Sequence, residues 1–190
     1  MSTQCNSGAE TGEYLAKYYS IIADMVAGMT GAELTNSISH NFIVQMIPHH
    51  EGAIAMSKNI LTYTQNADLR SIAENIIAEQ TKSIEDMKAI TEASEKLVNY
   101  SYDLQEYQNR INNIMQTMFH RMRNACTSNN IDADFIREMI PHHMGAVCMS
   151  ETTLRYYIYP ELRPILRAII SSQKKGIEQM RYLLNRIQRS

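Results

Sequence analysis

This chain contains the stretch Met46-Ile47-Pro48-His49-His50 twice, and the second copy is Met139-Ile140-Pro141-His142-His143. Glycine, alanine and a Met-Ser pair follow both copies at the same spacing. A proline inside a helix removes a backbone hydrogen bond and costs about 3 kcal/mol. Adjacent histidines on a buried face need partners for their ring nitrogens. Because the chain accepts both costs twice, we expect the motif to form a functional site.

The repeat extends well beyond this motif. When the sequence is shifted by 93 positions, residues 42–87 align with residues 135–180 without a gap, and about half of the aligned residues are identical. We therefore predict a tandem duplication. The first repeat is predicted to span residues 1–98 and the second residues 99–190, with one shared core.

Each repeat is predicted to contain three helices. The chain has only seven glycines and four prolines, and few helix breakers together with long 3.6-residue hydrophobic patterns are typical of an all-α protein. Polar residues near Ser39 and Asp132 are the predicted caps of the second helix in each repeat. The predicted helices span residues 10–29, 39–64, 67–97, 103–125, 132–157 and 160–188.

The histidines are predicted to point into the bundle. On a helical wheel, Met46 and His49 share one apolar strip, and His50 lies on the adjoining one. The opposite face is predicted to be polar and consists of Gln45, Glu51, Lys58 and Asn59.

Methionine is unusually frequent, and ten of the thirteen methionines are duplicated in place. Thioether sulfur is a soft ligand that suits Cu(I), and imidazole binds copper, zinc, nickel and iron, so copper is the expected metal and other transition metals stay open. Met46 precedes His49 by three residues and His50 by four, so one helix can present sulfur and nitrogen together. The predicted metal ligands of the first repeat are Met25, Met29, Met46, His49, His50 and Met56. Those of the second repeat are Met118, Met122, Met139, His142, His143 and Met149.

Structural explanations of the same residues stay open. Methionine at helical spacing commonly fills a core, and a histidine on an apolar face is commonly a hydrogen-bonded core residue. Gln80 and Gln173 are predicted to orient the histidine rings as a second shell. Alternatively, they are buried amides that pair with each other or with the backbone.

Composition limits the partners and the location of the protein. A net charge of −2 and an isoelectric point near 6.3 do not favour nucleic-acid binding. No stretch approaches the ~20 apolar residues of a membrane span, and no secretory signal is visible. We therefore expect a cytoplasmic protein, or an exported one if a signal has been removed. Cys5, Cys126 and Cys148 are expected to be free thiols. Homo-oligomerisation stays open.

The duplicated motif resembles that of the family called domain of unknown function 305. The resemblance rests on Met-Ile-Pro-His-His-x-Gly-Ala-x-x-Met-Ser, followed by Leu-Arg, Ile-Ile-x-x-Gln and Ile-x-x-Met. It implies a ferritin-like helical bundle, made here of two pseudo-symmetric three-helix repeats, and some relatives are associated with copper. Where the family often has an acid, this chain has Ser83 and Gly176, and an aspartate retained as Asp132 is Ser39 in the first repeat. These changes remove oxygen ligands.

Three classes of function are consistent with these features. We favour a metal-binding protein with methionine and histidine ligands that binds copper for storage or tolerance. A structural bundle with core histidines and no metal is the first alternative. A ferritin-like di-metal oxidase is the second, although such sites use Glu-x-x-His motifs and the chain has none. No nucleophile–base arrangement is visible, so we expect no enzymatic activity.

Overall fold

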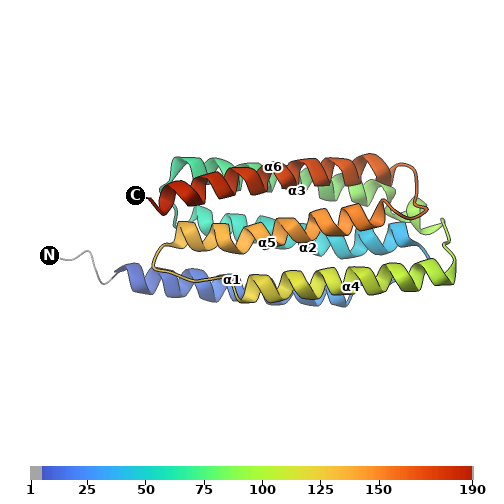
Figure 1. The fold of residues 1–190 in the computed structure, drawn as a ribbon, viewed down its shortest axis with the longest axis horizontal. Helices are drawn as coiled ribbons and strands as arrows, with labels where there is room; N and C mark the ends of the chain where they lie inside the picture. The colour runs from blue at the N-terminus through green and yellow to red at the C-terminus, as the bar shows by residue number, and fades with distance from the viewer. Residues whose placement is uncertain (1–5, 190) are drawn as a thin grey trace.

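The computed structural model describes residues 6–189, and all of its regular structure within them is helical. The all-α prediction is confirmed. Figure 1 shows the helices aligned with the long axis of the molecule. No helix in this part of the chain is both long and apolar enough to cross a membrane. The helices are α1 (Asn6–Thr30), α2 (Ile38–Leu61), α3 (Ala67–Glu95), α4 (Ser101–Arg123), α5 (Ile131–Thr153) and α6 (Leu162–Ile187).

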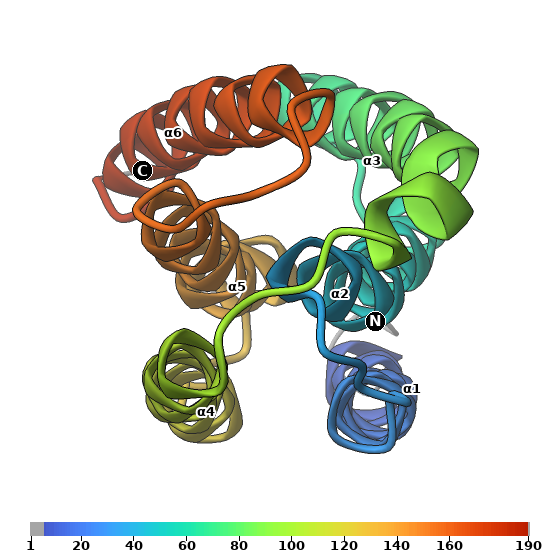
Figure 2. The same cartoon turned by 90° about the vertical axis from the view of Figure 1, so that its right-hand side faces the viewer.

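The six helices form three layers of two, as the view along the bundle shows (Figure 2). Helices α2 and α5 form the middle layer and pack against each other. Helix α1 covers α2 and α4 covers α5 on one side, while α3 and α6 cover them on the other and also contact each other. The second helix of each repeat, which contains the His-His motif, therefore lies in the centre. The ferritin-like comparison and the division into two units stay predictions.

Several helix ends differ from the predicted ones. The N-caps are Ser37, whose hydroxyl accepts from the His40 backbone N–H, and Asn130, whose side chain accepts from the Ala133 N–H. Each lies two residues before the predicted cap. Ser39 has another role, because its hydroxyl accepts a hydrogen bond from the Tyr159 backbone N–H at 2.8 Å.

The largest differences are four residues long. Helix α1 begins at Asn6 instead of residue 10, and α5 ends at Thr153 instead of residue 157. The segment between α5 and α6 crosses the end of the bundle (Figure 2). Pro160 lies within this segment and disfavours a helical conformation of Tyr159.

Asn99 joins the two halves at this end of the bundle. Its side-chain oxygen accepts from the Ile38 backbone N–H at 2.9 Å, and its amide donates to the Tyr157 carbonyl at 2.7 Å. Its own backbone N–H donates to the carbonyl of Asn36 at 2.9 Å. Asn99 thus fixes the start of α2 to the segment before α6, and it is itself buried.

Replacing Asn99 by alanine is expected to lower the free energy of unfolding by about 3 kcal/mol. The change leaves the buried N–H of Ile38 and the carbonyl of Tyr157 without partners, and each such group costs about 1–3 kcal/mol. Urea unfolding followed by circular dichroism measures the effect. Tyr100→Ala is the control, because Tyr100 is 84% exposed and its loss should change stability by no more than about 0.5 kcal/mol. Equal effects of the two variants would contradict the assignment.

Candidate metal centre

The first histidine of each motif meets its counterpart at the interface of α2 and α5. The rings of His49 and His142 lie 3.7 Å apart between centroids, with an interplanar angle of 31°. The Nε2 of His142 lies 3.1 Å from the His49 carbonyl oxygen. Because a carbonyl can only accept, this nitrogen is the protonated one, and a neutral ring then has its lone pair on Nδ1. That Nδ1 and both ring nitrogens of His49 are buried without a partner.

The second histidine of each motif points toward the outer layer formed by α3 and α6. The Nε2 of His50 lies 3.0 Å from the Ser83 hydroxyl. His143 faces Gly176, where a Cβ atom would come within 3.1 Å of the ring. Ser83 and Gly176 are the positions where the family resemblance implies an acid. His50 therefore lies next to a hydroxyl group, whereas His143 lies next to a glycine that has no side chain.

All four motif histidines are buried, with at most 2% of each exposed, which confirms the inward orientation predicted from the helical wheel. Burial lowers the pKa of His50 to about 3 and that of His142 to about 4. Burial and the neighbouring histidines also hold the pKa values of His49 and His143 well below 6.5. The rings are therefore neutral at pH 7, which is the form that binds metals.

Nitrogen and oxygen donors alone do not complete a site. Among residues 6–189, no three histidine, cysteine, aspartate or glutamate side chains come together in a way that could hold a metal ion. Cys126 and Cys148 are exposed free thiols, and Cys5 lies outside the described residues.

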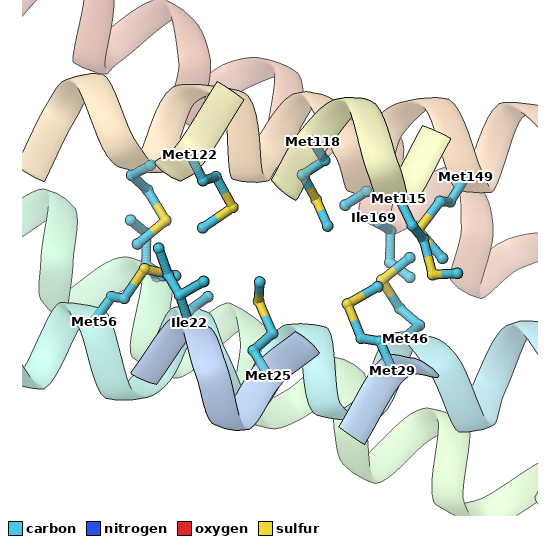
Figure 3. Packing of buried hydrophobic residues seen from close by; sticks show 14 of the residues in the cluster. Ile22, Met25, Met29, Met46, Met56, Met115, Met118, Met122, Met149 and Ile169 are labelled. Carbon is cyan, nitrogen blue, oxygen red and sulfur yellow. The ribbon is translucent and has the colours of Figure 1, made fainter. Parts of the chain in front are cut away.

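Methionine sulfur is the other potential donor that is abundant in the interior of the bundle. Methionine side chains from α1, α2, α4 and α5 lie in the space between α1 and α4 and against the adjoining faces of α2 and α5 (Figure 3). The members shown are no more than 2% exposed. We call this group the methionine layer, and its labelled members are Met25, Met29, Met46, Met56, Met115, Met118, Met122 and Met149.

The methionine layer has two ends and a middle. At one end the side chains of Met46 and Met29 gather with those of Met115 and Met149, while Met56 lies with Met122 at the other end (Figure 3). Of Met25, Met29 and Met56, the alternatives expected to join Met46, Met29 lies at the same end of the layer, whereas Met46 and Met56 lie at opposite ends. They lie ten positions apart on one helix, which separates them by about 15 Å at 1.5 Å per residue.

In the middle of the layer, Met25 and Met118 point toward each other from α1 and α4 (Figure 3). Each lies against a motif glycine. A Cβ atom on Gly52 would come within 2.8 Å of the Met25 sulfur, and one on Gly145 would come even closer to the Met118 sulfur. The glycine after each His-His pair therefore makes room for a methionine sulfur next to the middle helix.

Gly145→Ala is expected to lower the free energy of unfolding by about 1–3 kcal/mol, because overpacking a close-packed core has a cost of that size. The added methyl group would also lie within 2.9 Å of the Met118 Cγ, so the whole side chain must move. Chemical denaturation measures the loss, which should shrink when Met118 is also changed to alanine. Gly12→Ala is the control, since Gly12 lies within α1 and an added methyl group would meet no atom within 4 Å. That substitution should stabilise the helix by about 1 kcal/mol.

Sequence comparison identifies the family of the chain. The family model described as "Domain of unknown function (DUF305)" matches residues 39–184. The chain belongs to the DUF305 family. This range covers both His-His motifs and most of the methionine layer. No protein in the curated set matches the chain.

Solved structures of similar proteins include metal-bound forms. The Ag-bound form of CopM is 30% identical to this chain with a TM-score of 0.58, and the match covers 78% of this chain and 95% of CopM. The Cu(I)-bound form of CopM is 28% identical with a TM-score of 0.57, covering 81% and 98%. A DUF305 fragment from Deinococcus radiodurans is 23% identical with a TM-score of 0.58 over 78% and 96% of the two chains, and shows the same fold.

The donors in this DUF305 chain fit a soft metal ion. Unpartnered nitrogens of neutral histidines lie in the middle layer, and thioether sulfurs lie on its α1 and α4 side. Gln80 and Gln173 are buried on α3 and α6, and their side-chain oxygens lack partners. Their role in orienting the histidine rings stays a prediction.

Glu138 is a residue that our interpretation of the sequence missed. It is 1% exposed, and the Tyr14 hydroxyl donates to its carboxyl group at 2.5 Å. Burial raises the pKa of Glu138 to about 8. Its counterpart Gln45 was placed on the polar face together with Asn59, and both are buried. The hydrogen bonds of Gln45 to the Met29 carbonyl and of Asn59 to the Tyr14 carbonyl explain why polar residues lie there.

Met115 is the second omission. The repeat alignment places Ile22 opposite it, so it is not one of the duplicated methionines. The signal that could have found it is its spacing from Met118 and Met122, which follow by three and seven residues and form one face of α4. In the structure these three methionines are all buried and all point into the layer.

Proposed function

We propose that this DUF305 protein binds copper as Cu(I) through histidine nitrogens and methionine sulfurs, and holds it without catalytic turnover. The observation that carries the proposal is the set of neutral, buried motif histidines, each with at least one ring nitrogen that lacks a partner, next to a buried layer of thioethers. A chain that served only for packing would gain stability by replacing such nitrogens with apolar atoms.

The candidate ligand sets follow from the helix positions. The candidate ligands are His49, His50 and Met46 in the first half, and His142, His143 and Met139 in the second. Met25, Met29, Met118, Met122, Met56 and Met149 are the further candidates. Thioether donors favour Cu(I) over Zn(II), because zinc prefers imidazole, thiolate and carboxylate ligands. The CopM structures, which include Cu(I)-, Cu(II)- and Ag-bound forms, support the same choice of metal.

Such a protein would store copper or buffer its concentration. Burial of the donors limits contact of a bound ion with water and oxidants, and no substrate has to reach it for this role. The proposal therefore predicts tight binding and slow release instead of an enzymatic rate.

Copper competition tests the proposal. The full chain, with its three cysteines replaced by serine to remove thiol ligands, is titrated under argon with Cu(I) against a chromophoric chelator. We expect at least one Cu(I) per chain to be held, and zinc to be displaced by Cu(I). A protein that leaves all copper on the chelator, or that binds zinc more tightly than Cu(I), would contradict the proposal. Oxygen consumption after addition of Fe(II) should not exceed that of buffer.

A further inference from the structure

The two ends of the methionine layer are built from both halves of the chain. At the end that contains Met46, the neighbouring methionines come from α1, α4 and α5 as well as α2 (Figure 3). We call these residues the Met115 cluster, and its members are Met29, Met46, Met115 and Met149. Each of the four helices therefore supplies one thioether to this end.

The opposite end has the same plan but one sulfur fewer. The shift of 93 residues relates Met29, Met46 and Met149 to Met122, Met139 and Met56, and it relates Met115 to Ile22. Figure 3 shows Ile22 beside Met56 and Met122, at the place that corresponds to Met115. The fourth thioether is therefore present at one end and replaced by a branched alkyl group at the other.

The Met115 cluster is buried, and its members are between 0% and 2% exposed. Helices α1 and α4 pack on α2 and α5 respectively, and long flexible side chains fill the space between them. Methionine has three rotatable bonds beyond its backbone, so four sulfurs from four helices can turn toward one point without movement of the backbone.

We propose that the Met115 cluster is a separate site for a soft monovalent cation, Cu(I) or Ag(I), in which thioether sulfurs are the only protein ligands. The proposal rests on the proposed function and deepens it by locating one of the sites. Thioethers are uncharged and soft, which suits a soft monovalent ion better than a divalent one. The motif histidines point elsewhere: His49 contacts His142, and His50 contacts Ser83 on α3.

Silver titration followed by NMR tests the site in the full chain. The cysteine-free protein is labelled at the methionine methyl carbons and titrated with silver nitrate in chloride-free buffer. We expect the four methyl signals of the Met115 cluster to shift together. The signals of Met87 and Met180, which are buried on α3 and α6 outside the layer, are the internal reference and should not shift in step with those of the cluster.

A matched pair of variants tests the difference between the ends. Met115→Ile copies the residue present at the other end and should weaken Ag(I) binding at the cluster at least tenfold. Ile22→Met makes the reverse change and should add a second site of similar affinity. Signals of the cluster that do not move with silver, or an affinity unchanged in Met115→Ile, would overturn this inference.

Copper binding and the NMR response of the cluster test the proposed function and the thioether site separately. A wild-type chain that binds Cu(I) while the cluster signals stay unchanged overturns the thioether site and leaves copper binding intact. A wild-type chain that binds neither Cu(I) nor Ag(I) overturns both. Because the NMR measurement uses the wild-type methionines, it gives an answer even if the Met115→Ile chain does not fold.

Discussion

Lowering the pH from 7 to about 4 is expected to unfold the metal-free protein. Each motif histidine stays neutral in the folded state, because burial lowers its pKa far below 6.5. In the unfolded chain the same histidine takes up a proton below pH 6.5. The unfolded state then binds more protons, so stability is complete above pH 6.5 and is lost as the pH falls. Each histidine contributes about 1.4 kcal/mol per pH unit.

Glu138 acts in the opposite direction. Its folded pKa of about 8 lies above the usual value of 4.5, so the folded state binds more protons between these two values. Its contribution to stability therefore grows as the pH falls through this range. On unfolding in this range, the four motif histidines take up protons and Glu138 releases one. The net uptake is therefore about three protons, and the free energy of unfolding falls by about 4 kcal/mol per pH unit between pH 6 and 4.5.

Urea unfolding at pH 7, 6 and 5, with a chelator present, measures this slope. Domains of this size are stable by about 5–15 kcal/mol, and the expected loss of about 5 kcal/mol between pH 7 and pH 5 is a large part of that stability. His120→Leu is the control, because His120 is exposed on α4. This substitution should leave the pH dependence of the free energy of unfolding unchanged. A free energy of unfolding that stays constant from pH 7 to 5 would show that the histidines become protonated without unfolding.

The double substitution His49→Leu, His142→Leu is expected to weaken Cu(I) binding by more than about 100-fold, which exceeds the effect typical of a change outside the ligand shell. The same variant should be more stable than the wild type without metal, by about 1–3 kcal/mol at pH 7. Both rings are buried with unpartnered nitrogens, and an apolar side chain of similar size removes that penalty. Loss of binding together with a gain in stability identifies residues kept for a ligand.

Two measurements separate binding from folding in this variant. Thermal unfolding with and without Cu(I) should show a metal-dependent rise in Tm for the wild type and none for the double variant. His40→Leu is the matched control, because His40 is also a buried histidine on α2 but lies outside the motif. That variant should retain the response to copper. A double variant that unfolds under all conditions would identify the histidines as core residues.

Much of the fold could be predicted from the sequence because helical periodicity is a local property. The position of Met46, His49 and His50 on one side of α2 follows from 100° per residue, and the buried rings agree with it. Gln45 shows the limit of that argument. The wheel assigns a polar residue to the outer face, but α2 is covered on two sides by α1 and α3, so this residue is buried as well.

The composition of the ends of the methionine layer could not be predicted in the same way. Periodicity states which face of a helix a residue occupies, but it does not state which residues of another helix lie at the same height. Met149 lies with Met46 because α2 and α5 run in opposite directions, and only the packed structure shows this (Figures 1 and 3). The stacked pair His49 and His142 is a further example of a contact across 93 residues.

Each end of the methionine layer is built from side chains of both repeats. A protein with a single repeat could complete such an end only by pairing with a second copy of itself, and its two ends would then be identical by symmetry. Joining two repeats in one chain makes the pairing independent of concentration. It also allows each end to change alone, as Ile22 opposite Met115 and Gln45 opposite Glu138 show. One chain can thus carry two chemically different ends, which a symmetric dimer of a single repeat could not have.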